Sequence, residues 1–197
     1  MRANFPVRLG PAEDALIAQL KAAGADATAE RITVAGLPTR RVESYHYTDL
    51  KTLLRAIPPL ATAANEASAP ALRIPGAFNL MIANGVIQNA ATAPAGVIVG
   101  KAHGGVLTTR DDVLVHINGA LAKEALTLTL ENSVDPVIQV ERRIEGEAAH
   151  VADALKVFVA DNASATIVET FSGSDAAHVG NHATYLSVGK NAVATHI

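Results

Sequence analysis

The sequence predicts a mainly β chain with a small helical region at its N-terminus. Within the first 60 residues, apolar side chains recur at helical spacing, whereas from Phe78 onward they alternate with their neighbours as in a strand. The later residues form short apolar runs that are separated by turn formers, and one such unit recurs further along the chain. These patterns are expected for a parallel β-helix, and a β-sandwich is the alternative that they leave open.

The N-terminal region, residues 1–60, is predicted to hold three short helices. Gly10-Pro11 begins the first helix, because proline is favoured in the first turn, and Gly24 ends it. Two further helices are expected at about 27–35 and 48–57, the last of them stopped by two prolines. Three short helices bury little surface by themselves, so this region is expected to dock on something larger.

Residues 61–76 are rich in alanine and small polar side chains and are predicted to be a linker between the helices and the β region at 77–197. An alanine-rich helix is the alternative for the first half of this linker. A β-hairpin is expected at 78–89, because Asn84-Gly85 is a strong signal for a tight turn.

The rest of the β region is predicted to be a series of short strands, with a turn or short helical piece at about 118–124. The expected strands are 97–99, 113–117, 126–130, 137–141, 156–160, 165–171, 183–188 and 192–197.

An internal repeat relates residues 159–166 to residues 188–195. In each copy a strand leads into an Asn-Ala turn and a second strand follows. Stacking the two copies in register would place Asn162 beside Asn191 and Ala165 beside Ala194, which is how a solenoid buries a continuous core of small residues.

The composition excludes several classes of function. A net charge of −3 gives no basic surface for nucleic acid, and the chain has no cysteine for a disulfide, a thiolate nucleophile or a thiolate metal site. The first residues lack the apolar core of a signal peptide, and no apolar run approaches the roughly 20 residues of a membrane span. We therefore predict a cytoplasmic protein that binds neither nucleic acid nor membranes.

The segment from Gly36 to Leu50 carries the densest pattern in the chain. Gly36 can take the left-handed conformation that ends a helix, and Pro38 prevents the helix from resuming. Thr48 or Asp49 can then cap a new helix.

This segment closely resembles the N-terminal signature of the SufB/SufD family, the iron–sulfur cluster assembly proteins of the SUF system, and it is most like SufD. The family reads Gly-Leu-Pro-Thr-x-Arg, then Glu-x-Trp-Lys-Tyr-Thr, with Leu two residues later. Tyr45 and His46 stand where the family has Trp and Lys. The positions that fit are Gly36 to Thr39, Arg41, Glu43, Tyr47, Thr48 and Leu50.

The resemblance continues through the β region. The Asn84-Gly85 hairpin is similar to the strand that enters the family's core. Three later segments are similar to the family's Leu-Asn-x-Ala, Ile-Glu-x-Tyr-x-Gly and Val-Gly-x-Asn-Ala segments: His116 to Ala120, Ile167 to Gly173, and Val188 to Ala192.

The resemblance implies a right-handed parallel β-helix between helical regions, in a complex with a SufB-like β-helix subunit and the SufC-like ATPase. Family members continue well beyond the position of Ile197, so it also implies a truncated β-helix that lacks the segment contacting the ATPase. Because the chain has no cysteine, cluster chemistry is expected to belong to the complex and not to thiolates of this chain.

Three histidines, with Asp175 and Glu169 nearby in the sequence, are candidates for a metal site. His178 and His182 are four residues apart, a spacing that would align them on a helix, but Gly180-Asn181 between them predicts a turn. A loop with two solvated histidines is the favoured interpretation, and His196 would join them only if the coils stack suitably. We therefore assign no metal, cofactor or catalytic residue.

Two further segments resemble catalytic motifs only superficially. The segment from Gly96 to Ala102 is one residue short of a phosphate-binding loop and lacks its hydroxyl residue, so a strand and turn is expected. Ser172 to Asp175 lies close to His178 but has no nucleophile-elbow pattern, so a turn is expected there too.

Carboxylates offer the remaining chemistry, because glycoside hydrolysis needs two of them facing each other. The candidates are Asp111, Asp112, Glu141, Glu145 and Glu147. Arginines at 142 and 143 interleave with the last three, which predicts a solvated charged turn.

A surface formed by Arg40, Arg41, Glu43, Tyr45 and His46 is a candidate for docking a partner. The favoured alternative is intramolecular: Glu43 pairs with an arginine and the tyrosines pin the helices to the β core.

The sequence therefore favours a non-catalytic scaffold for iron–sulfur cluster assembly. A β-helix enzyme acting on carbohydrates and a self-associating structural module, including a homodimer, are the alternatives.

Overall fold

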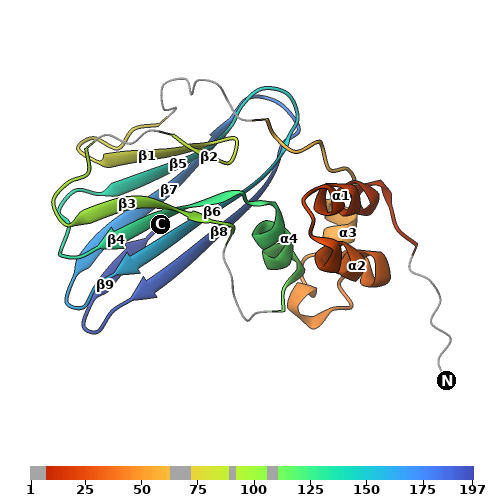
Figure 1. The fold of residues 1–197 in the computed structure, drawn as a ribbon, viewed down its shortest axis with the longest axis horizontal. Coiled ribbons are helices and arrows are strands. Elements are labelled where there is room, and N and C mark those ends of the chain that lie inside the picture. Colours follow the sequence, from red (N-terminus) through yellow and green to blue (C-terminus); the bar gives the residue numbers. More distant parts are fainter. Residues whose placement is uncertain (1–7, 63–71, 89–91, 106–110) are drawn as a thin grey trace.

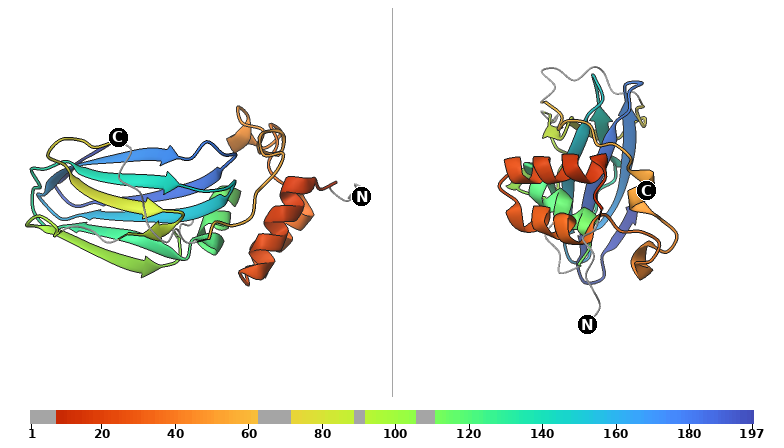
Figure 2. Two further views of the ribbon diagram at one scale, coloured as in Figure 1. Left: turned by 90° about the horizontal axis from the view of Figure 1, so that it is seen from above. Right: turned by 90° about the vertical axis from the view of Figure 1, so that its right-hand side faces the viewer.

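The structure is a computed structural model that describes residues 8–62, 72–88, 92–105 and 111–197. Two sheets face each other, and the helices gather at one end of their strands, with α4 (Val113–Leu121) between the sheets and the other helices (Figures 1 and 2). Among the described residues, no helix has the length and apolar character needed to cross a membrane.

The N-terminal region folds as expected, with one exception. The first two helices are α1 (Pro11–Ala22) and α2 (Asp26–Ala35), and a 3-10 turn follows at Glu43–Tyr45. Helix α3 (Leu50–Leu53) is shorter than predicted; Asp49 caps it by accepting from the Thr52 amide. The predicted linker lies largely outside the described residues.

Buried Glu13 ties these helices together. Its carboxylate accepts hydrogen bonds from the amides of Gly10 and Leu37 at 2.6 and 2.7 Å, and it lies 3.1 Å from the Lys51 ammonium. Burial alone would raise the pKa of Glu13, but these hydrogen bonds and Lys51 hold it below its ordinary value.

The strands form one five-stranded and one four-stranded sheet. The five-stranded sheet has the order β2-β1-β5-β7-β9, and the four-stranded sheet has the order β3-β4-β6-β8. The strands are β1 (Phe78–Ala83), β2 (Val86–Ile87), β3 (Val97–His103), β4 (Glu124–Leu130), β5 (Ile138–Ile144), β6 (His150–Val159), β7 (Ser164–Gly173), β8 (Val179–Val188) and β9 (Val193–His196).

From β4 onward, successive strands alternate between the two sheets, and each pairs in parallel with the strand two positions later. The four pairings share one offset of 29 residues, because Ala125 pairs with Ala154, Ile138 with Ile167, His150 with Val179 and Ser164 with Val193. The β1–β2 hairpin is antiparallel, and so is the pair β3–β4, whose strands are separated in the chain by α4. The fold is thus mixed α/β, with two facing sheets that do not close on each other.

The internal repeat predicted the register correctly. Ala165 pairs with Ala194, and the Asn191 side-chain amide donates to Asn162 Oδ1 at 3.3 Å. Both asparagines have positive φ, at 61° and 56°, a conformation that asparagine tolerates better than most residues. Asn84, in the predicted hairpin turn, has φ 49°.

The space between the sheets is filled by aliphatic side chains from both of them, such as Leu80 and Ile138 from one sheet and Leu126 and Leu155 from the other. A second apolar cluster joins the helices to the outside of β6 and includes Leu16, Ile32 and Ile117. The helical region therefore docks on the β region through α4, as its small size required.

Two predictions of local structure were wrong. Residues 113–117 begin helix α4, not a strand, because Asp112 Oδ1 accepts from the amides of Leu114 and Val115 and so starts a helix. Gly180-Asn181 lies within strand β8, not in a turn, where its backbone pairs with β6.

Candidate functional site

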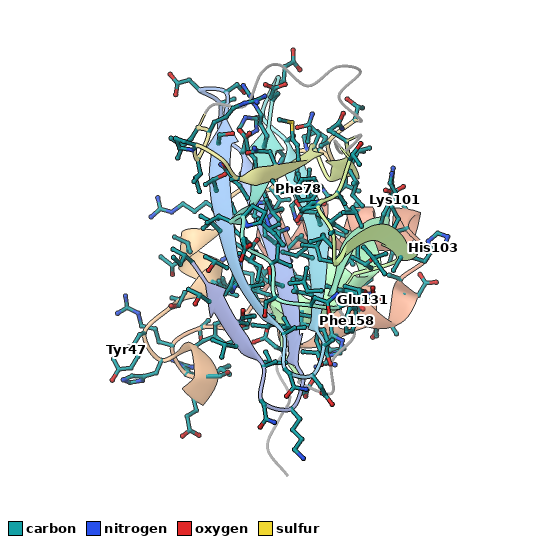
Figure 3. The ribbon with its side chains drawn as sticks, turned by 90° about the vertical axis from the view of Figure 1, so that its left-hand side faces the viewer. Tyr47, Phe78, Lys101, His103, Glu131 and Phe158 are labelled. Atoms are coloured by element: carbon teal, nitrogen blue, oxygen red, sulfur yellow. The ribbon has the colours of Figure 1, made fainter. Side chains whose placement is uncertain are left out.

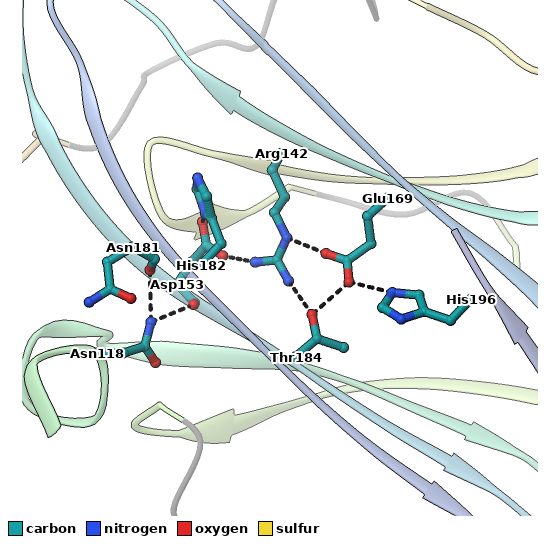
Figure 4. A network of polar contacts seen from close by, with 8 residues as sticks. All are labelled: Asn118, Arg142, Asp153, Glu169, Asn181, His182, Thr184 and His196. Carbon is teal, nitrogen blue, oxygen red and sulfur yellow. Dashed lines mark hydrogen bonds and ion pairs between the residues drawn. The ribbon is translucent and has the colours of Figure 1, made fainter. Parts of the chain in front are cut away.

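Arg142 of β5 is the centre of a polar network between the two sheets (Figure 4). Its side chain is fully buried, and each of its three nitrogens has an oxygen partner. Nη1 contacts Asp153 Oδ1, Nε lies 2.5 Å from Glu169 Oε2, and Nη2 lies 3.0 Å from Thr184 Oγ1. This guanidinium thus joins β6, β7 and β8 to β5.

The polar side chains of the network lie between the sheets because successive side chains of a strand point to opposite faces of its sheet. Arg142 shares its face of β5 with Ile138 and Val140, and Asp153 shares its face of β6 with Leu155 and Val157. The charged side chains therefore occupy interior positions. A buried charge is tolerated only when it is paired, and here both carboxylates contact the guanidinium.

Glu169 carries the network toward the open edge of the sheets. Its Oε1 accepts from the Thr184 hydroxyl at 2.6 Å and lies 2.7 Å from His196 Nε2. Burial would raise the pKa of Glu169, but the charge of Arg142 and these hydrogen bonds lower it below its usual value. Glu169 is therefore an anion at neutral pH.

His182 lies on the other side of Arg142. Its Nδ1 is 2.8 Å from Asp153 Oδ2, and burial, reinforced by the charge of Arg142, lowers its pKa from 6.5 to about 4. The imidazole is therefore neutral at pH 7, so its Nδ1–H donates a hydrogen bond to Asp153 Oδ2.

Asn118 of α4 holds this end of the sheet in place. The residue is fully buried, and its side-chain amide donates to the backbone oxygens of Asp153 and Asn181 at 2.9 and 2.8 Å. One side chain thus joins α4 to both β6 and β8 (Figure 4).

With a neutral His182, the core of the network holds one cation, Arg142, and two anions, Asp153 and Glu169. On the side toward β9, Glu169 contacts His196, whose side chain is 35% exposed. Among the described residues, no three His, Asp or Glu side chains are grouped so that they could hold a metal ion.

The predicted histidines do not converge. His182 and His196 reach the network from opposite sides, whereas His178 contacts Ser174. His182 is largely buried in a strand, so the predicted loop with two solvated histidines was wrong.

Ser174 Oγ and His178 Nε2 lie 2.9 Å apart. In this hydrogen bond the histidine is the donor, whereas nucleophilic catalysis requires the histidine to accept the serine proton. His178 Nδ1 accepts from the Ala149 amide, so in the neutral ring the proton lies on Nε2, which donates to Ser174 Oγ. The hydroxyl in turn donates to the backbone oxygen of Gly146. The imidazole therefore cannot take the serine proton in this arrangement.

The predicted carboxylates are dispersed over separate elements. Asp111 pairs with Arg31, and Asp112 caps α4. Glu141 accepts from the Ser172 hydroxyl at 2.7 Å and is buried in β5. The solvated charged turn expected from Glu141 to Glu147 was wrong, because its first half is a strand with buried charges.

The remaining segments are structural. Gly96 directly precedes strand β3, which contains Val97 to Ala102, and Lys101 pairs with Glu124. Tyr45 donates its hydroxyl to Asp112 Oδ1 at 2.9 Å; burial, together with this bond, raises its pKa to about 12. This contact pins the 3-10 turn to α4, not to the β core as expected.

The other part of that expectation was wrong. Tyr47 is 94% exposed and points away from the body of the molecule (Figure 3). Glu43 forms no ion pair with an arginine within the described part of the chain.

Sequence reasoning missed Arg142, Asp153 and Thr184. The signal that identifies the first two is alternation: each is a charged side chain at the interior position of a strand whose other interior positions are aliphatic. Thr184 shows no comparable signal.

No protein-family model matches the chain, and no curated protein matches its sequence.

Proposed function

We propose that this chain is a non-catalytic scaffold subunit for iron–sulfur cluster assembly, a SufD-like member of the SufB/SufD family, in a cytoplasmic SufBCD-type complex. Its β region is proposed to be part of a right-handed parallel β-helix. In this proposal, ATP hydrolysis and thiolate chemistry belong to the SufC-like and SufB-like partners.

The observation that carries the proposal is the constant 29-residue offset in both sheets. Strands that alternate between two sheets and pair in parallel at one offset are what a coiled solenoid requires. A β-sandwich instead pairs its strands mainly antiparallel, so this pairing favours the β-helix over the sandwich.

The residues that carry the family resemblance also hold the coils together. A Cβ at Gly173 would lie 2.7 Å from the Ile144 oxygen, and a Cβ at Gly189 would lie 2.7 Å from the Asp161 nitrogen. Only glycine fits such close approach of neighbouring coils. Asn191 stacks on Asn162 in the turn, and Asn118 fastens α4 to two strands.

A β-helix partner would dock on the open strands β8 and β9. Each is the edge strand of its sheet, and apolar side chains are exposed on or beside them: Leu186, Val188, Val193 and Ile197. An exposed apolar edge strand offers unpaired backbone groups and apolar contacts to another strand.

The test is copurification of the full chain with a SufB-like protein, expressed with and without a SufC-like ATPase. We expect a stable complex with the SufB-like protein. Val188→Glu on β8 should weaken it at least tenfold, because it buries a charge. The matched control is Ile98→Glu on β3, the opposite edge of the same sheet, with similar exposure.

Equal binding by the two variants would move the interface away from β8, and no complex at all would overturn the SufD-like assignment. The same open edges favour a second candidate, self-association. A mass in solution that rises with concentration, is unaffected by SUF partners and falls in Val188→Glu would select that candidate.

A further inference from the structure

A cavity of about 270 Å³ lies where the helices meet the beginning of β8. Its helical side is apolar and well buried, and is formed by Leu16, Leu50, Ile57 and Ile117. Its sheet side is polar, and is formed by His150, Asn181 and His182. An apolar chamber with a few converging polar groups is the usual form of a small-molecule site.

His150 presents an unpartnered nitrogen in this buried place. The Gln19 amide nitrogen donates to the Pro58 oxygen at 2.7 Å, so the Gln19 oxygen faces His150 and accepts from its Nδ1 at 2.6 Å. Burial lowers the pKa of His150 to about 4, so the ring is neutral and its Nε2 carries only a lone pair. His150 is 2% exposed, and within the described residues its side chain forms one hydrogen bond, the Nδ1 bond to Gln19.

The other two polar side chains repeat the pattern. His182 donates through Nδ1 to Asp153, which leaves its Nε2 as an acceptor close to Gly180. The Asn181 side chain donates through its nitrogen to the Leu114 oxygen, which leaves its amide oxygen as an acceptor. All three groups that line the cavity therefore have acceptor capacity to spare, and the single ring donor of each neutral histidine is already used.

We propose that this cavity binds a small uncharged molecule with an apolar, phenol-sized body and one hydroxyl or N–H group, which donates to His150 Nε2. This site is independent of the proposed scaffold function. Acceptor groups repel an anion, and the apolar wall gives a cation no counter-charge, so a neutral donor is the chemistry that completes the cavity.

The test uses the full chain and two probes of nearly equal shape, phenol and anisole, in calorimetric titrations. Phenol has the hydroxyl donor and anisole does not. We expect phenol to bind about tenfold more tightly, because anisole leaves the buried acceptor unpaired. Two results would overturn the proposal. One is equal affinity for the two probes, and the other is no binding of phenol at about 10 mM, which lies above the millimolar dissociation constants of weak complexes.

Two variants locate the site. His150→Leu should remove the preference for phenol, whereas His178→Leu, the same change outside the cavity, should keep it. If His150→Leu does not fold, Leu54→Phe fills the cavity from the helical side and should abolish binding of both probes. Phenol affinity that is unchanged in every folded variant contradicts the site.

A metal is the competing occupant, because both histidines donate Nδ1 to an acceptor as metal ligands do. Cobalt(II) is the probe for it. A visible spectrum of imidazole-bound cobalt that disappears in His150→Leu would assign the cavity to a metal and overturn the proposal; absence of that spectrum supports it.

Discussion

The interior between the sheets has two halves that are built from the same strands. In β6, Leu155 and Val157 belong to the apolar half, whereas Asp153, two residues earlier, belongs to the network around Arg142. Strand β7 divides in the same way, with Ile167 on the apolar side and Glu169 on the polar side. Because the two halves are formed by the same strands, the difference between them lies in their side chains.

The two halves contribute differently to the fold. Burial of aliphatic side chains stabilises the fold by about 25 cal/mol per Å² of apolar surface removed from water. This stabilisation does not depend on which aliphatic side chain is the neighbour. The paired charges are sensitive to register instead, because a slip of one residue would place Arg142 on the opposite face, away from both of its carboxylates. We infer that the apolar half supplies stability and the polar half specifies register.

The largest effect is expected from Arg142→Met. Removing the guanidinium leaves Asp153 and Glu169 buried without their cation, which should cost about 3–5 kcal/mol of unfolding free energy. Urea denaturation followed by circular dichroism measures it. Lys101→Met is the control, because that pair is exposed and its loss should cost less than about 1 kcal/mol.

A triple variant sharpens the comparison. Combining Arg142→Met with Asp153→Leu and Glu169→Met removes all three charges, and we expect it to recover most of the lost stability, since no charge remains unpaired. A single Arg142→Met variant as stable as the parent chain would show that pairing does not hold the polar half.

A somewhat smaller effect is expected from Leu155→Ala in the apolar half. Leu155 is fully buried, so the change should cost about 3 kcal/mol through lost transfer energy and the cavity it leaves. Leu186→Ala on β8 is the matched change at a side chain that is 37% exposed, and it should cost clearly less. Equal losses in urea denaturation would mean that Leu186 is covered in solution.

Sequence reasoning succeeded where one local signal determines the structure. The Asn-Ala turns at Asn162 and Asn191 fixed the register of two strands, because few residues other than glycine and asparagine accept positive φ. It failed at 113–117, where a short apolar run was predicted to be a strand and the cap at Asp112 selected a helix.

The residues of the candidate site were harder to predict, because contacts between distant parts of the chain bring them together. Gly180 is a turn former by propensity, yet it lies in β8, where a Cβ would collide with the His182 ring. Such a requirement arises from tertiary packing and leaves no trace in local propensity. Likewise, the partners of Arg142 lie 11, 27 and 42 residues away along the chain, so no spacing rule joins them.

The smallest effect concerns His182 and the pH dependence of stability. Its pKa is about 4 in the folded chain and about 6.5 when unfolded, so below pH 6.5 the unfolded chain binds the extra proton. Stability must therefore fall as the pH decreases, by about 2 kcal/mol between pH 7 and pH 5 for this residue.

His182→Asn keeps a donor for Asp153 but does not titrate, so it should lose about 2 kcal/mol less than the parent chain over that interval. His150 titrates in the same direction in both proteins and cancels in the difference, and Glu169 enters only below about pH 4.5. Urea denaturation at both pH values measures the difference, with His116→Asn on α4 as the control. Parallel pH profiles for the parent chain and His182→Asn would mean that His182 is solvated in solution and that the polar half is open to water at β8.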